Sequence, residues 1–461
     1  MANKRLPYII VAVAASVISV IGAVTTTVTS VVDNEYKENL ELAQQFADEK
    51  LFEKSVYYYD LVISNKDTKE FRVEELNAIK SGMDMGEFDD DDYQQYLSSF
   101  MSEYYNDKTP YEMSLKYYFE IQEYDTCISI INNAVKYGVS SSEINAIDKQ
   151  IERKYKLVKT NYSNVTPFRN YMAAIALDEQ YGVVQDTGST IINYGYDNVS
   201  PYFYASENED ETRIYAFVKD NNLNYLVNMN FVRQAYFPEE VEQSTGVGDE
   251  LLSCKVGEKY VYYNIDGTKA FGNYDYASKF VTNIAAVKVN DEWALIDTKG
   301  NKISQETFDD VKLNGFGECV KNKTVFAMKN GSYVYTAYTY QDGKLVDTGK
   351  EFEDVDLPPS SGEYIAFASN DRWGFMDSKL NVVIEPTYKN AHSFSNGYAG
   401  VQTDQGWNFI NVKNETIIDL DDEFEDTKYF SVFDNNDGSK SGYCYVKLNG
   451  AWQLLSLYKC K

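Results

Sequence analysis

The stretch YIAFASNDRWGFMDSKLNVVIEPTY, residues 364–388, decides the fold of the larger part of this chain. It begins with a run of apolar and small residues, turns at an Asn-Asp pair, and continues into a second apolar run that contains Trp373. A polar turn after Asp377 leads to a third run, residues 382–388. Short β-favouring runs that are separated by Asn, Asp and Gly turns predict consecutive antiparallel strands.

This unit recurs along the chain, with clear copies at residues 284–303, 398–418 and 443–456 and weaker copies that carry Tyr in place of Trp. The aromatic residue near the start of the second strand lies at eight positions, Tyr181, Tyr225, Tyr260, Trp293, Tyr333, Trp373, Trp407 and Trp452. One unit of three or four strands cannot bury its own face, so the units must stack or close. A period near 40 residues predicts a β-propeller with seven or eight blades over residues 168–461. An open, twisted succession of hairpins is the alternative.

The copy at residues 364–388 resembles the WG-repeat family, whose unit carries Trp-Gly, an aromatic-Ile-Asp run, and Val-Ile-x-Pro followed by x-Tyr. The matching residues here are Trp373, Gly374, Phe375, Met376, Asp377, Val383, Ile384, Glu385, Pro386 and Tyr388. The other three Trp copies replace the glycine with Ala294, Asn408 and Gln453. The resemblance therefore depends on the whole period, and it covers about 290 residues.

Simple physical roles account for the repeated residues. We expect each aromatic ring to pack into the core, in preference to stacking on sugars or ring-bearing ligands. A glycine beside the ring allows a neighbouring strand to approach closely. Asp297, Asp377 and Asn411 each end a strand, where they can accept backbone N–H bonds from the following turn.

Residues 33–162 predict a helical region that resembles tetratricopeptide repeats. The pentapeptide at residues 75–79, ELNAI, recurs as EINAI at 143–147, which is 68 residues later and twice the 34-residue period of such repeats. Four acids at residues 89–92 favour a helix start over a cation site, because they lack the spacing of a calcium loop. Stacked helix pairs usually present a protein-binding face, so this region is predicted to be a docking surface or a spacer.

Residues 1–32 predict a signal-anchor that crosses a membrane. Two basic residues precede an uncharged run from residue 6 to residue 32, and acids follow it. This asymmetry places the N-terminus in the cytoplasm and the rest outside. The alternative is a signal peptide that is cleaved to give a secreted protein.

Charge and cysteine content exclude several classes of protein. With 71 acidic and 43 basic residues the formal charge is −28, which disfavours binding to nucleic acid. The five cysteines form no CxxC pair, which argues against a zinc site and a disulfide framework. We expect free, mostly buried thiols, although spacing leaves a bridge between Cys444 and Cys460 open.

No catalytic, cofactor-binding or metal-binding residues are predicted. His392 is the lone histidine, and its position between two repeat units favours a solvated turn residue. No GxSxG motif or P-loop occurs, and the acidic loop at residues 434–438 lacks the glycine and glutamate positions of a calcium loop.

The predicted function is non-enzymatic recognition of a protein or a cell-envelope component by an anchored extracytoplasmic protein. Two alternatives remain. Residues 260–272 resemble a cell-wall carbohydrate-binding repeat, although such repeats recur about every 20 residues and the intervals here are 33 to 45. An unrecognised hydrolase is the second alternative.

Overall fold

The computed structural model describes residues 24–186, 188–205, 213–359, 364–420, 424–434 and 440–460. The chain divides into two compact units, residues 1–148 and 149–461. Most of the predicted signal-anchor, residues 1–32, lies outside the described residues. Within the described ranges, no helix is both long and apolar enough to cross a bilayer.

Seven helices are described before the first strand. They are α1 (Val24–Asp48), α2 (Phe52–Asn65), α3 (Lys69–Met83), α4 (Asp90–Glu103), α5 (Lys108–Glu120), α6 (Tyr124–Lys136) and α7 (Ser142–Ile151). The two echoed pentapeptides lie in α3 and α7, where Leu76 and Ile144 are both buried. The predicted acidic helix start is confirmed, because Asp89 and Asp92 form a capping box at the beginning of α4.

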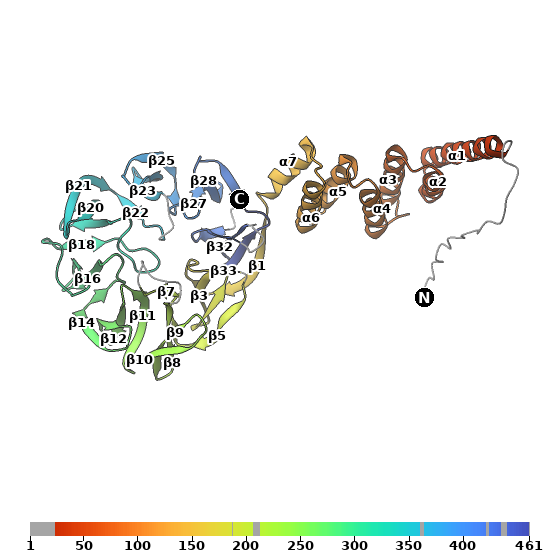
Figure 1. The fold of residues 1–461 in the computed structure, drawn as a ribbon. Helices are drawn as coiled ribbons and strands as arrows, with labels where there is room; N and C mark the ends of the chain where they lie inside the picture. Colours follow the sequence, from red (N-terminus) through yellow and green to blue (C-terminus); the bar gives the residue numbers. More distant parts are fainter. Residues whose placement is uncertain are drawn as a thin grey trace. The chain divides into compact units, whose positions relative to one another are not determined.

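The described strands of the β unit form sheets of four to seven strands that follow one another along the chain, and Figure 1 shows them around a ring. The first sheet is β2 (Asn164–Val165), β3 (Met172–Leu177), β4 (Gln180–Gln185) and β5 (Thr190–Tyr196). The second is β6 (Asn198–Val199), β8 (Ile214–Asp220), β9 (Leu223–Asn228) and β10 (Arg233–Phe237), with β7 (Phe203–Tyr204) also paired to β8. The third is β11 (Val241–Gly248), β12 (Leu251–Val256), β13 (Lys259–Asn264) and β14 (Lys269–Tyr274).

The fourth sheet has seven strands and spans two repeat units. They are β15 (Tyr276–Ala277), β16 (Ala285–Val289), β17 (Glu292–Ile296), β18 (Phe308–Val311), β19 (Thr324–Lys329), β20 (Tyr335–Gln341) and β21 (Lys344–Phe352). The fifth sheet is β22 (Asp354–Asp356), β23 (Ile365–Ser369), β24 (Arg372–Met376) and β25 (Val382–Tyr388). The sixth is β26 (Asn390–Ala391), β27 (Tyr398–Thr403), β28 (Gly406–Asn411) and β29 (Thr416–Asp419).

The seventh sheet joins the two ends of the β unit. It contains β30 (Phe424–Thr427), β31 (Ser431–Asp434), β32 (Lys440–Leu448), β33 (Ala451–Leu457) and β1 (Tyr155–Tyr162). The strand β1 pairs antiparallel with β33, with Leu157 opposite Leu455. One core cluster then links this sheet to the first, because Trp452 and Tyr445 pack with Val165 and Ala173. The arrangement is propeller-like, with its last sheet completed by the strand that precedes the repeats.

The strand β1 lies within residues 33–162, which were expected to be helical. Its sequence, YKLVKTNY, carries Tyr, Val and Thr, which favour strands. The segment forms a strand by pairing with β33, a partner that its own short sequence does not reveal. The β unit therefore begins before residue 168.

The strand registers show where the eight aromatic positions lie. Six of them hold the same place in the repeat. Each lies opposite a residue on the neighbouring strand of its hairpin, and that residue pairs in turn with the innermost strand. Trp373, for example, lies opposite Ala368, which pairs with Asp354. They are Tyr181, Tyr260, Trp293, Trp373, Trp407 and Trp452.

The remaining two predicted positions are displaced. Asn224 holds the equivalent place in the second sheet, and Tyr225 is its neighbour. The turn before β20 is longer than the two-residue turns of most other hairpins, so Tyr333 lies in that turn with 93% of its surface exposed. Tyr335 takes the equivalent place.

The glycine of the Trp-Gly pair is required by the close approach of an outer strand. A Cβ atom on Gly374 would lie 2.5 Å from the carbonyl oxygen of Ile384 in β25. The equivalent residue in the fourth sheet is Ala294, and the segment 302–307 beside it forms no outer strand. The predicted turn role is also confirmed, since Oδ1 of Asp377 accepts the N–H groups of Lys379 and Asn381.

All five cysteines are free, and all but Cys460 are buried. The expectation of free, mostly buried thiols is confirmed. No bridge joins Cys444 and Cys460.

Candidate functional site

The lone histidine is not a solvated turn residue. His392 directly follows β26, and its Nε2 atom lies 3.0 Å from Oδ1 of Asp426 in β30. Its Nδ1 atom lies 3.9 Å from Oδ1 of Asp356, which ends β22. The imidazole ring stacks on Trp407 at 5.3 Å between centroids and 8° between planes. Only 23% of the side chain is exposed, so the prediction was wrong.

The repeat itself brings this cluster together. Asp356 and His392 hold equivalent places in two consecutive repeat units. Each is one residue beyond the residue of the innermost strand that pairs with the next strand: Val355 pairs with β23, and Ala391 pairs with β27. Successive sheets around the ring therefore present these side chains to one another. Aligning the units on their short inner strands, instead of on their aromatic residues, would have revealed this position.

Two further residues of the cluster hydrogen-bond the Asp356 carboxylate. The Tyr429 hydroxyl donates to both carboxylate oxygens at 2.8 and 2.9 Å, and the Ser393 N–H donates to one of them at 2.6 Å. The Ser393 hydroxyl bonds the Asp356 carbonyl and accepts the Ala366 N–H, so it is not directed at His392. The histidine and the hydroxyl therefore do not form a nucleophile–base pair.

The electrostatics of the cluster favour a charged imidazole. Burial disfavours the charge, but the carboxylates of Asp356 and Asp426 outweigh it and raise the pKa of His392 to about 9. Burial also opposes ionisation of Asp426, and the attraction of His392 outweighs it and holds the pKa of Asp426 below its usual value. The imidazolium therefore links three consecutive sheets at neutral pH.

A second buried cluster links segments that are far apart in the sequence. Glu318 is 3% exposed, and its Oε1 atom lies 2.5 Å from Nζ of Lys279, which is 2% exposed. The guanidinium of Arg169 pairs with the same oxygen, and Asn314 donates to Oε2 at 2.9 Å. The Lys279 Nζ atom also lies 3.3 Å from the centroid of the Phe203 ring, a cation–π contact.

Neither cluster is arranged as a metal centre. Across the part of the chain that the structure describes, no group of three or more His, Cys, Asp or Glu side chains is placed to hold a metal ion. The groups in both clusters are instead satisfied by each other. Their geometry is suited to holding neighbouring sheets together.

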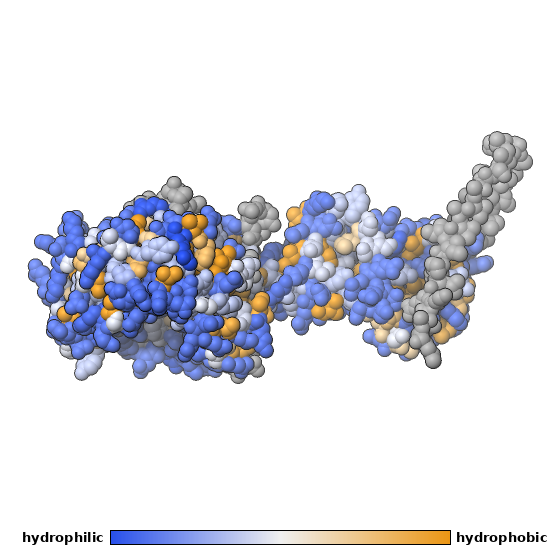
Figure 2. Space-filling model, turned by 90° about the horizontal axis from the view of Figure 1, so that it is seen from below, coloured by the Kyte–Doolittle hydropathy of each residue, from blue (hydrophilic) through white to orange (hydrophobic). Residues whose placement is uncertain are grey.

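The helical unit carries an open groove between α4 and α6. Its volume is about 400 Å³, and it is lined by Met101, Thr126, Ser129, Ile130, Asn132, Asn133 and Lys136. Tyr105 and Tyr137 follow Met101 and Asn133 by four residues, and their rings lie 4.9 Å apart with both side chains exposed. Figure 2 shows apolar patches on the surface of this unit.

Comparison with known proteins identifies the repeat. Residues 373–407 match the WG containing repeat. The chain therefore contains a WG repeat at these residues, as the sequence predicted. The matched segment does not reach the helices, so their tetratricopeptide-like character stays a prediction. No curated protein matches the chain.

Solved structures with a similar arrangement have low sequence identity. Hsv2 of Kluyvelomyces marxianus aligns with a TM-score of 0.33 and 9% identity, over 60% of this chain and 93% of that chain. The Neurospora crassa Pan2 WD40 domain gives 0.30 and 12%, over 57% and 90%. PorZ of Porphyromonas gingivalis, a component of a type-IX secretion system, gives 0.31 and 6%, over 66% and 46%.

Proposed function

We propose that this protein is a non-enzymatic interaction protein, anchored by residues 6–32 and exposed on the outer side of a membrane. Its β unit is a closed eight-bladed propeller that acts as a rigid scaffold, and its helical unit docks a partner protein. A basic tip before an uncharged run, with acids after it, supports the anchor and its orientation.

The groove between α4 and α6 is the observation that carries the docking role. Met101 and Ile130 give it an apolar floor, and the side chains of Ser129, Asn132 and Asn133 supply hydrogen-bonding groups. An apolar floor with a polar rim is the usual anatomy of a protein interface.

The charge of the helical unit selects the partner. Residues 33–148 contain 26 acidic and 10 basic residues, a net charge of −16. A field of this sign attracts a positively charged partner and repels an acidic one. The occupant is therefore a protein segment with an apolar anchor and flanking Lys or Arg residues.

A photo-crosslinking residue at Asn133 should capture this partner in cells that produce the protein. Binding of the purified partner is then measured by calorimetry. Asn133→Arg places a bulky cation in the groove and is expected to weaken binding by roughly tenfold or more, because it removes rim contacts and repels the basic segment. Affinity should also fall as salt rises.

Val135 provides the matched control, because it lies on the same helix and is 71% exposed but does not line the groove. Val135→Arg should leave the affinity nearly unchanged. Equal losses for both variants, or a crosslink to a polysaccharide instead of a protein, would overturn the proposal. The anchor is tested in the same cells, where protease added outside should degrade the part beyond residue 32.

A further inference from the structure

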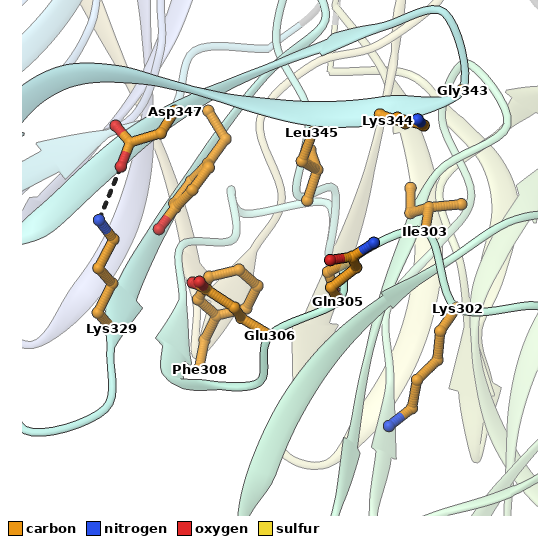
Figure 3. Close-up of a pocket in the computed structure, with 12 residues that line it drawn as sticks. Lys302, Ile303, Gln305, Glu306, Phe308, Lys329, Gly343, Lys344, Leu345 and Asp347 are labelled. Carbon is orange, nitrogen blue, oxygen red and sulfur yellow. Dashed lines mark hydrogen bonds and ion pairs between the residues drawn. The ribbon is translucent and has the colours of Figure 1, made fainter.

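A pocket of about 490 Å³ lies in the fourth sheet of the β unit (Figure 3). It is lined by Lys302, Ile303, Ser304, Gln305, Glu306, Phe308, Lys329, Tyr338, Gly343, Lys344, Leu345 and Asp347. This volume falls within the range of about 300–1,000 Å³ that is typical of small-molecule sites.

The pocket exists because one repeat unit lacks its outer strand. In the fifth sheet, for example, β25 covers the hairpin that precedes it. In the fourth sheet the corresponding segment, 302–307, forms no strand. It makes an isolated bridge between Ile296 and Lys302, and Ile303 and Ser304 each hydrogen-bond the backbone of Leu295. The strand β17 pairs with β18 at a single position. The long β20–β21 hairpin forms the opposite wall, and Figure 3 shows Leu345 projecting from it toward Gln305 and Phe308.

The floor of the pocket is formed by two buried aromatic rings. Phe308 is 1% exposed and Tyr338 is 5% exposed, and their rings meet edge to face at 5.4 Å. The Tyr338 hydroxyl is also buried, and the ammonium of Lys329 lies 5.8 Å from the centroid of its ring.

The rim has an excess of positive charge in a chain that is strongly acidic. Lys329 is paired with Asp347 at 2.7 Å. The remaining charged residues of the lining are one acid, Glu306, and two bases, Lys302 and Lys344. No ion pair joins either of these two lysines to another described residue. Ammonium groups on a polar rim beside partly exposed apolar side chains favour a ligand with a negative charge and an apolar body.

We propose that this pocket binds a small amphipathic organic anion, a carboxylate attached to a ring or a short alkyl chain. The apolar body lies against Ile303 and Leu345, the partly exposed apolar residues of the lining. The carboxylate lies near Lys302 and Lys344. The two floor rings are too buried to offer their faces, so the site does not suit stacking on a sugar.

The test uses 4-methylbenzoate as probe and 4-methylbenzamide as its neutral match, with binding to the full chain followed by ligand-observed NMR titration. The carboxylate should bind at least about tenfold more tightly than the amide, which corresponds to about 1.4 kcal/mol. K302Q/K344Q should remove this preference while the fold remains intact.

The matched control is K269Q/K413Q, which removes two exposed lysines that do not line the pocket. This variant should keep the preference. The proposal is overturned if 4-methylbenzoate shows no saturable binding at millimolar concentration, or if K302Q/K344Q keeps the full preference. Asn133→Arg should have no effect on the probe, so this result is independent of the docking groove.

Discussion

Replacing Glu318 with glutamine should lower the free energy of unfolding of the β unit by about 3–5 kcal/mol, the usual cost of breaking a buried ion pair. Lys279 is 2% exposed and Arg169 pairs with the same carboxylate oxygen, so the change leaves two cations facing a neutral amide. Burial opposes ionisation of Glu318, yet the attraction of Lys279 and Arg169 holds the pKa of this carboxyl well below its usual range. The carboxyl of Glu318 therefore stays ionised further into the acid range than an ordinary glutamate does.

Urea unfolding followed by tryptophan fluorescence measures this loss, because all four tryptophans lie in the β unit. Asp404→Asn is the matched control, since Asp404 pairs with Lys389 at 2.8 Å but is 74% exposed. An exposed pair contributes about 0–1 kcal/mol. A loss for Glu318→Gln no larger than that of the control would contradict the role of the cluster. The triple variant R169M/K279M/E318L should recover much of the stability, because apolar residues can replace all the members of a buried ionic cluster.

His392→Gln should cost about 2–3 kcal/mol at pH 6, and the cost should disappear as the pH rises through about 9. The pKa of His392 is raised from 6.5 to about 9, so the folded protein holds the proton more tightly than the unfolded chain does. The stabilisation is complete below about pH 6.5 and is lost as the pH rises through the folded pKa. Because 23% of the side chain is exposed, water screens the pair, and we take a value below the full shift.

Urea unfolding of the wild-type protein and the variant at pH 6, 7.5 and 10 tests this dependence. The difference between the two proteins is the relevant quantity, since other groups titrate equally in both. Thr403→Val is a suitable control in the same sheet, because it removes a half-buried hydroxyl and its hydrogen bonds without changing the charge, so its cost should not vary with pH. A difference that stays constant from pH 6 to pH 10 would show that His392 acts only through packing.

The period of the repeat could be predicted from the sequence, because each unit is a local hairpin with its own turn residues. Trp373, Gly374 and Asp377 carry information about contacts only a few residues away. Tyr333 shows the limit of this approach, because two added turn residues move the aromatic ring out of register. The missing outer strand at residues 302–307 has a sequence signal, since KISQET lacks the apolar run of VVIEPT.

The buried clusters could not be predicted in the same way. His392 and Asp426 are 34 residues apart, and Arg169 and Glu318 are 149 apart. Their contacts depend on which sheets become neighbours around the ring. Composition identified one histidine and many acids, but only the arrangement of the sheets shows which acids face that histidine.

Closure of the ring by β1 and β33 is the central claim, because it places the first repeat beside the last. Lys156 lies opposite Ser456 in this pairing. Cysteines at these two positions should form a disulfide under mild oxidation, and peptide mass spectrometry should find residues 156 and 456 linked within one chain. The K156C/K447C control should give no such link, because Lys447 lies on β32, one strand further away. Absence of the 156–456 link, or its appearance only between different chains, would contradict a ring closed by β1.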